Sequence, residues 1–500
     1  MLSQTTPSLA DAGGPSHAEV ELGSPGVAGL DVNPSRSASA ASRTSHGVDA
    51  LIALAILLIT GPIIQLWSAQ PASRYTLTAA IVDDHTLQID RYEGVLGIDR
   101  AHFDGHTYSD KAPYQPLLAV PPYQLFRALG GEPFPVVDGE QRVNVSTHVG
   151  LWWVTFWSAT VPAIVLTLTI RRLVRRVHPA VATPVALAMT LGTTILPFTS
   201  WLFGHVLAAM WVALALVLLA PEAPTRRAFA MAGACLGLGI GTEYTVAVLA
   251  LILLLDILRV RRWGGAAALS IGTVVGTVPL LVYNWLVFRD PFEVSYQGHL
   301  PNFQGSGAFG VFNLTLPQAD EVARALISDR GLFVLTPVMT VAVVGCLLAI
   351  SGKSPGRREG WLGLTSLVAF ITVSTGIDGL GGDSPGPRYL IPMFPFLAIP
   401  LAHVWQRFGR PCAVAAGIGA ATMWMAAVTT PDIASTAPNA LGTWAERLAD
   451  GRMASNILTG RDHPWVLVVT ALAGLVAIGA SLRASRLDAG EPQPVGSRAA

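Results

Sequence analysis

The residues best suited to chemistry lie in one polar stretch between the first two apolar segments of the chain. Two adjacent carboxylates, Asp83 and Asp84, stand near its start, and Asp110 and Lys111 follow further along. A carboxylate can remove a proton from a hydroxyl group, and an ammonium group can bind a phosphate as a compact point charge. Function tends to concentrate in loops, so this stretch is a candidate site, although such residues are also ordinary in a solvated loop.

Lys111 stands out because arginine supplies nearly all the positive charge of the chain. Of the 32 basic residues, only Lys111 and Lys353 are lysines. If the loop needed only a positive charge, we would expect an arginine at this position, as elsewhere in the chain. We therefore expect Lys111 to contact a phosphate or a sugar hydroxyl, with chance placement as the alternative.

Three further ionisable groups lie beside apolar segments. His205 follows an aromatic turn, Glu243 and Tyr244 separate two short apolar runs, and Arg388 and Tyr389 follow a turn rich in Gly and Pro. Ionisable groups at membrane depth are costly and are functional candidates by default. The structural alternatives are an interhelical hydrogen bond for the histidine, a salt bridge for the glutamate and snorkelling at a helix end for the arginine.

The elements that must position these residues are apolar helices. Mean hydropathy is +0.50 and only 13% of residues are charged, against about 25% in soluble domains. A helix that spans a membrane needs about 20 mostly apolar residues. We therefore predict an all-α polytopic membrane protein with about twelve transmembrane helices. The segments are 49–68, 149–170, 179–197, 203–220, 228–242, 243–258, 265–287, 332–351, 361–377, 388–405, 411–430 and 464–482.

The placement of basic residues predicts the orientation of these helices. Loops on the cytoplasmic side of a membrane carry an excess of Lys and Arg. In this chain the basic residues of the short loops fall in alternate loops, which places them on one side of the membrane. They are Arg171, Arg172, Arg175, Arg176, Arg226, Arg227, Arg259, Arg261, Arg262, Lys353, Arg357, Arg358, Arg407, Arg410, Arg483 and Arg486. This alternation holds only if residues 228–258 form two short helices, and it makes both termini cytoplasmic.

Three regions follow from this topology. Residues 1–47, rich in Ala, Ser, Gly and Pro, are predicted to form a disordered cytoplasmic arm. Residues 48–483 form the transmembrane domain, and its first extracytoplasmic loop, 69–148, holds the polar stretch. Residues 484–500 form a cytoplasmic tail. Abundant Arg, Ala and Gly are typical of GC-rich bacteria, so we expect a bacterial plasma membrane protein with an extracytoplasmic active face.

Several protein classes are excluded by the sequence. A formal net charge of zero lacks the basic footprint of a nucleic-acid-binding protein. No Walker A sequence, dinucleotide fingerprint or His-Glu-x-x-His zinc motif occurs. The three cysteines lie inside apolar stretches without the spacing of a metal site. Within the first loop, residues 74–82 and 115–129 are amphipathic and are expected to form interfacial helices.

Taken together, the polar motifs resemble those of GT-C membrane glycosyltransferases. The similar branch includes the lipid A aminoarabinose transferase and the protein O-mannosyltransferases. The resemblance rests on the pair Arg74-Tyr75, on Asp110-Lys111 before a proline-interrupted helix, and on His205 after an aromatic turn. It rests also on Gly386-Pro387-Arg388-Tyr389-Leu390-Ile391-Pro392 and covers roughly residues 49–405.

The resemblance implies a GT-C-like fold and an inverting transfer of a sugar from a polyprenyl-phosphate donor to an extracytoplasmic hydroxyl. The acceptor would be an envelope glycan, a lipid or a protein, and membrane lipid would be a further partner. It implies that Asp84 or Asp83 is the general base, with Asp110 as the second choice. Lys111 and Arg388 would stabilise the charge on the departing phosphate. The substrate site would also include Arg74, Tyr75, His205, Glu243, Tyr244 and Tyr389. A divalent metal is compatible with the motif but not required by it, and no metal ligand is predicted.

The sequence departs from the family pattern at one point. Many members carry the catalytic acid just before the Arg-Tyr pair, whereas residues 68–73 contain no acid here. Asp83 and Asp84 are the predicted replacements, since paired acids at the end of this helix occur in some GT-C arabinosyltransferases.

Two other functions stay open at this point. The chain could be a transporter or flippase for an envelope lipid or glycan. Transporters often contain internal repeats and place polar groups near mid-membrane, whereas no repeat is visible here and the polar residues cluster at one surface. The second alternative is a catalytically inactive scaffold in envelope assembly, which the missing acid favours.

Overall fold

The computed structural model describes residues 34–65, 67–134, 148–293, 295, 316–352, 356–377, 380–434, 437 and 439–488. The chain divides into Met1–Arg43 and Thr44–Ala500, and the second unit contains the candidate residues. Residues 1–33 and 489–500 lie outside the described residues, so most of the predicted arm and tail cannot be compared with it. Helix α1 (Pro34–Thr60) begins inside the stretch predicted to be disordered.

Each of the twelve apolar segments predicted from the sequence contains at least one helix. The helices after the first loop are α4 (His148–Thr155), η4 (Phe156–Thr160), α5 (Val161–Arg175), η5 (Pro179–Val181), α6 (Ala182–Leu191), α7 (Ile195–Phe198), α8 (His205–Leu219), α9 (Arg226–Ile240), α10 (Val246–Arg259) and α11 (Trp263–Phe288). They continue with α12 (Ala319–Ile327), α13 (Leu332–Leu335), α14 (Pro337–Ser351), α15 (Arg357–Ile377), η6 (Arg388–Leu397), α16 (Ala398–Arg407), α17 (Gly409–Thr429), α18 (Ala440–Ala449) and α19 (Val466–Asp488).

Six helices of the described chain are long and apolar enough to cross a membrane by themselves. They are Val149–Arg175, Trp263–Phe288, Arg357–Ile377, Arg388–Arg407, Gly409–Thr429 and Val466–Leu487. The pair Ala319–Leu335 and Pro337–Ser351, bent by 99°, is a seventh if it forms one span. These helices confirm a multi-pass membrane protein, whereas the count of twelve crossings stays a prediction.

Residues 228–258 form two helices, as the alternation of basic residues predicted. The turn between α9 and α10 contains Glu243 and Tyr244. Helices α9 and α11 run parallel and touch through glycines. A Cβ atom at Gly233 or at Gly272 would lie 2.0 Å from a backbone carbonyl oxygen of the other helix. Small residues therefore permit the close backbone approach that is common where membrane helices pack.

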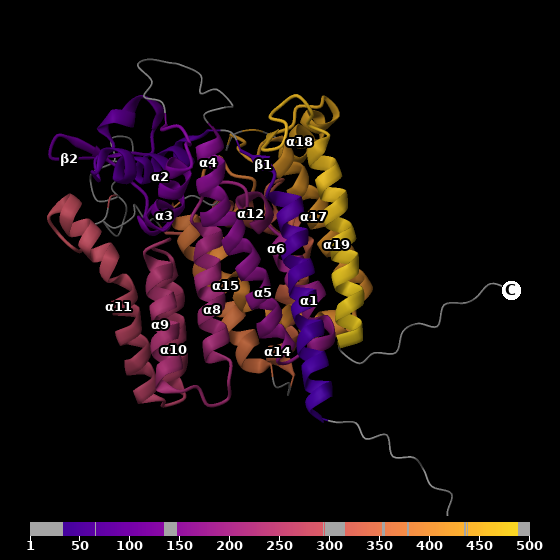
Figure 1. The fold of residues 1–500 in the computed structure, drawn as a ribbon. Helices are drawn as coiled ribbons and strands as arrows, with labels where there is room; N and C mark the ends of the chain where they lie inside the picture. The colour runs from indigo at the N-terminus through magenta and orange to yellow at the C-terminus, as the bar shows by residue number, and fades with distance from the viewer. Residues whose placement is uncertain are drawn as a thin grey trace, which may run out of the picture. The chain divides into compact units, whose positions relative to one another are not determined.

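The described part of the first loop, residues 69–134, contains two helices and a hairpin. Helix α2 (Ala69–Ala79) continues into the π-helical turn η1 (Ala80–Asp84), and η2 (Asp90–Val95) precedes strands β2 (Ala101–Phe103) and β3 (His106–Tyr108). Helix α3 (Tyr114–Ala128) follows. Helices α2 and α3 overlap the two stretches predicted to be interfacial helices, although their depth in a membrane stays a prediction. Figure 1 shows α2, α3 and β2 at the same end of the helices as α18.

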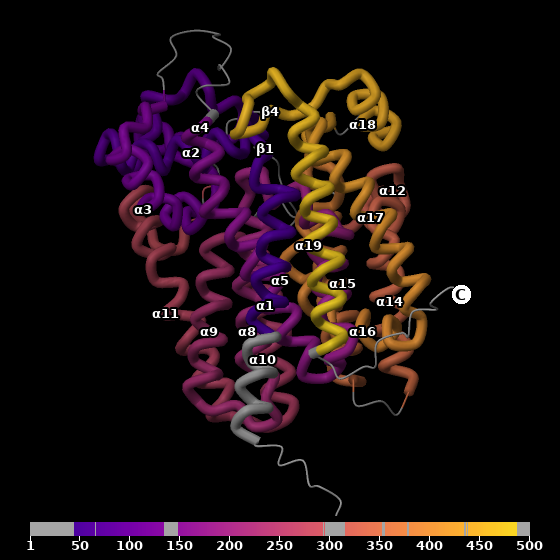
Figure 2. Tube along the Cα trace, turned by 45° about the vertical axis from the view of Figure 1, so that its right-hand side comes forward, coloured from indigo at the N-terminus to yellow at the C-terminus, as the bar shows by residue number. Residues whose placement is uncertain are grey.

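The first and last described helices help to hold this arrangement together. Helix α19 packs along α1, and a Cβ atom at Gly474 would lie 2.5 Å from the side chain of Ile59 (Figure 2). Above them, strand β1 (Ile63–Ile64) pairs in antiparallel fashion with β4 (Ser455–Asn456). The segment after α1 is therefore held in place before α2 begins.

Candidate active site

A cavity of about 720 Å³ lies where the first loop meets the ends of several helices. Its walls come from the residues around α2 and the hairpin, from the turn between α9 and α10, from α15 and from the segment that leads into η6. Seven ionisable side chains other than tyrosine line it among the described residues. They are Asp99, Asp110, Lys111, Glu243, Asp383, Arg388 and Asp432.

The first group in the cavity is a buried ion cluster around Lys111. The Lys111 Nζ atom donates to Asp110 Oδ2 at 2.6 Å and to Asp99 Oδ1 at 3.0 Å. Ser73 Oγ, on α2, donates to Asp110 Oδ1 at 3.0 Å. Burial and the charge of Asp99 raise the pKa of Asp110, whereas Lys111 lowers it. The Lys111 ammonium group thus binds two carboxylates, Asp99 and Asp110, one on each arm of the hairpin.

A second ion pair connects α2 to the turn after α9. Arg74 Nη2 lies 3.2 Å from Glu243 Oε1, and its Nη1 atom donates to Gln70 Oε1 at 2.6 Å. His205 Nδ1, at the start of α8, is 3.4 Å from the same Glu243 oxygen. Three elements far apart in the sequence therefore meet at one carboxylate beside the cavity.

Arg388 is a second cation on the cavity wall. Its guanidinium carbon lies 5.0 Å from the ring centre of Phe203 and 5.3 Å from that of Tyr389, and the guanidinium of Arg74 lies 5.6 Å from the Phe203 ring. Aromatic faces attract such cations. Arg388 is only 6% exposed, and its Nε atom has no hydrogen-bond partner among the described residues. A buried donor without a partner is costly, so this arginine is suited to an anionic ligand.

Two further carboxylates on the cavity wall come from later loops. Asp383 precedes η6, and Asp432 follows α17. Burial and the charge of Asp383 raise the pKa of Asp432 to about 6. With these two residues, carboxylates outnumber cations among the described residues that line the cavity.

Most of the residues predicted from the sequence meet at this cavity. Asp110, Lys111 and Glu243 line the cavity. Arg74 and His205 lie within 3.4 Å of the Glu243 carboxylate. The remaining predicted residues on the wall are Tyr244, Arg388 and Tyr389.

Asp83, Asp84 and Tyr75 are not among the lining residues. Asp83 accepts hydrogen bonds from Tyr123 at 2.8 Å and Arg127 at 2.7 Å. Asp84 accepts from Arg91 at 2.5 Å and from the Tyr92 hydroxyl at 2.9 Å. These contacts tie η1 to α3 and to η2.

Tyr75 belongs to an aromatic cluster. Its ring packs edge-on against Trp67, Tyr123 and Phe134, with ring centres 5.5 to 6.0 Å apart. Burial raises the pKa of its hydroxyl. This position supports a packing role for Tyr75 in the first loop.

The sequence prediction missed three carboxylates on the cavity wall: Asp99, Asp383 and Asp432. Asp383 lies in the turn rich in Gly and Pro before Arg388, and the sequence analysis selected no acid from that turn. Asp99 carried a local signal, because Asp104-Gly105 is a typical hairpin turn that brings the residues on either side together. Among the described residues, no group of three or more His, Cys, Asp or Glu side chains is arranged to hold a metal.

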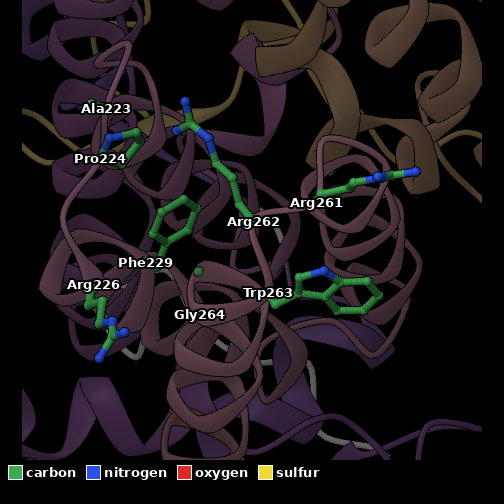
Figure 3. A pocket seen from close by; sticks show the side chains of 9 residues that line it. Ala223, Pro224, Arg226, Phe229, Arg261, Arg262, Trp263 and Gly264 are labelled. Carbon is green, nitrogen blue, oxygen red and sulfur yellow. The ribbon is translucent and has the colours of Figure 1, made fainter.

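A second hollow, of about 450 Å³, lies between the starts of α9 and α11. Figure 3 shows Arg226, Arg261 and Arg262 turned in different directions around Phe229 and Trp263. Arg262 donates to the backbone carbonyl of Glu222 at 2.7 Å. These are arginines predicted to lie on the cytoplasmic side, and they do not converge on one point.

Fold and cavity define a class: a multi-pass helical membrane protein with a polar, ion-rich cavity at one end of its helices. No protein-family model matches the sequence, and no curated protein matches it. Among solved structures, the chain is similar to the aminoarabinose transferase ArnT from Cupriavidus metallidurans bound to undecaprenyl phosphate. The two share 15% identity over 90% of this chain and 78% of that chain, with a TM-score of 0.50.

The apo form of the same ArnT matches with 17% identity over the same shares and a TM-score of 0.49. The Archaeoglobus fulgidus oligosaccharyltransferase in its apo form matches over 91% of this chain and 57% of that chain, with 11% identity and a TM-score of 0.42. The similarity to lipid-bound ArnT shows that this chain shares the fold of ArnT. The family resemblance predicted from the motifs is confirmed at the level of the fold.

Proposed function

We propose that this chain is a membrane glycosyltransferase that moves a sugar from a polyprenyl-phosphate donor to a hydroxyl group on an extracytoplasmic acceptor. One observation carries the proposal: in a GT-C fold, a cavity sets the cations Lys111 and Arg388 among buried carboxylates. This combination suits a reaction in which a phosphate leaves with negative charge while a hydroxyl group loses its proton.

The walls of the cavity support a donor with an apolar tail. Val248 of α10 and Val373 and Ile377 of α15 line it beside the charged groups. A polyprenyl chain can lie along such a wall while its phosphate meets Lys111 and Arg388. The undecaprenyl phosphate bound to ArnT supports a carrier of this chemical class.

The proposed reaction is a single displacement with inversion at the sugar. The acceptor oxygen forms a bond to the anomeric carbon as the bond from that carbon to the phosphate oxygen breaks. The electron pair leaves with the polyprenyl phosphate, whose charge Lys111 and Arg388 stabilise. A carboxylate of the cavity takes the proton of the acceptor hydroxyl.

The test is sugar transfer from radiolabelled polyprenyl-phosphate sugars in membranes that contain the full chain. We expect label in a new product, and at least a hundredfold less with Lys111→Ala. Lys353→Ala is a matched control, since it removes the only other lysine and should leave transfer unchanged. If purified protein binds undecaprenyl phosphate tightly but transfers no sugar from a panel of donors, the flippase or scaffold alternative replaces this proposal.

A further inference from the structure

The hairpin in the first loop brings two carboxylates together. Ala101 pairs with Tyr108, and Phe103 pairs with His106. The two turn residues, Asp104 and Gly105, have positive φ angles of 51° and 80°, as a type I′ turn requires. Extending the register by two residues on each arm places Asp99 opposite Asp110, on the same face because side chains alternate along a strand.

The two carboxylates have different surroundings. Asp110 has hydrogen bonds at both oxygens, from Ser73 and from Lys111, and its side chain is 2% exposed. The side chain of Asp99 is 9% exposed and, among the described residues, its one hydrogen bond is the contact from Lys111 to Oδ1. The Oδ2 atom of Asp99 is therefore the oxygen of this cluster that is available to a substrate in the cavity.

The charge of the cluster favours taking up a proton. One ammonium group between two ionised carboxylates leaves one negative charge in excess, and two buried like charges disfavour each other. Burial and the neighbouring carboxylate raise the pKa of Asp110 in particular. Because both oxygens of Asp110 accept hydrogen bonds, Asp99 Oδ2 is the oxygen of this pair that a hydroxyl group in the cavity can reach.

Three other candidate carboxylates, Asp83, Asp84 and Glu243, are already engaged. Asp83 and Asp84 have an arginine and a tyrosine each, outside the cavity lining. Glu243 pairs with Arg74 at 3.2 Å. Asp99 differs from all three because it combines a place on the wall, a contact with Lys111 and an oxygen without a partner among the described residues.

From this geometry we infer that Asp99 is the general base of the transfer and that Asp110 is a positioning residue that holds Lys111. The inference rests on the proposed function. The proton of the acceptor hydroxyl moves to Asp99 Oδ2 as the new glycosidic bond forms. The polyprenyl phosphate leaves towards Lys111 and Arg388. Asp99 thus supplies the acid that the stretch before Arg74 lacks.

Three isosteric variants of the full-length protein separate the roles. Asp99→Asn should lower kcat by about a hundredfold or more, the usual size of a general-base effect. Binding of undecaprenyl phosphate should change less than threefold, which also reports correct folding. Asp110→Asn should weaken that binding about tenfold, because Lys111 loses its closest partner. Asp84→Asn, which tests the competing assignment of the base, should change neither quantity more than threefold. Asp462→Asn is the control, because Asp462 is exposed and lies outside the cavity lining.

Two further measurements distinguish a base from a structural residue. The acidic limb of the pH profile of kcat/KM should disappear in Asp99→Asn, and Asp99→Glu should restore part of kcat. The assignment is overturned if the wild type transfers sugar and Asp99→Asn keeps kcat within threefold of it, or if Asp84→Asn loses transfer instead. A wild type that transfers no sugar from any donor would refute the proposed function itself, whatever the variants bind.

Discussion

Replacing Lys111 by methionine tests whether the ion cluster is built as described. The ammonium group lies 2.6 Å from one carboxylate oxygen and 3.0 Å from another, and its side chain is 4% exposed. Methionine keeps most of the length of the side chain and removes the charge. Asp99 and Asp110 would then face each other without a cation between them.

Breaking a buried ion pair costs about 3–5 kcal/mol, because the remaining charge has no counter-charge. We expect Lys111→Met to lower the free energy of unfolding by this amount at pH 7. The loss should shrink as the pH falls, since the pKa of Asp110 is already raised by burial and its protonation removes one of the two charges. Adding Asp110→Asn to Lys111→Met should recover at least half of the lost stability at pH 7.

The assay is equilibrium unfolding of the purified protein in mixed micelles, at about pH 7 and about pH 5. Lys353→Met is the matched control, because it removes the other lysine of the chain and should cost less than about 1 kcal/mol. A Lys111→Met protein as stable as the wild type would refute the buried cluster. So would a double variant that is no more stable than the single one.

Three other predictions address packing, electrostatics and topology. Gly233→Ala should lower stability by about 1–3 kcal/mol in thermal unfolding, since its Cβ atom would lie 2.0 Å from a carbonyl oxygen of α11. The control is Gly417→Ala, where nothing lies within 4 Å of the added Cβ atom, and it should be neutral or stabilise by up to about 1 kcal/mol. Equal losses in the two variants would contradict the packing of α9 against α11. Undecaprenyl phosphate should bind more tightly as the pH falls through about 6, where Asp432 becomes neutral, and Asp432→Asn should flatten this dependence in a binding titration; an unchanged slope would exclude Asp432 as its cause. A cysteine placed at His106 should react with an impermeant maleimide in intact cells and one placed at Ala223 only after permeabilisation, so the opposite pattern would reverse the topology.

The helices could be predicted because apolar runs and basic loops are local signals. The division of 228–258 into α9 and α10 was predicted from the polar pair Glu243–Tyr244 and supported by charge alternation, and the structure shows the turn. Composition could not reveal which helices touch. The contact of α9 with α11 depends on glycines such as Gly233 and Gly272 at matching heights on two helices, a relation between distant segments.

The candidate site was predictable where its residues form contiguous motifs. Asp110-Lys111 and Arg388-Tyr389 each place neighbours in sequence at the same wall. Asp383 and Asp432 come from two loops separated by η6, α16 and α17, so only the folded chain shows that they meet. The choice of Asp83 and Asp84 as base rested on a resemblance to paired acids at the end of this helix, and a sequence pair does not reveal that each acid is held by its own arginine and tyrosine.

The missing acid before Arg74 is explained by what replaces it. Gln70 lines the cavity in that stretch and accepts a hydrogen bond from Arg74, so an amide stands near the place where the family resemblance would put a carboxylate. Arg74 takes its negative partner instead from Glu243 on the turn after α9. An additional acid near residue 70 would compete for Arg74 in a cavity that already holds more carboxylates than cations. Supplying the acid from the hairpin avoids this competition, because Asp99 faces Lys111 rather than Arg74.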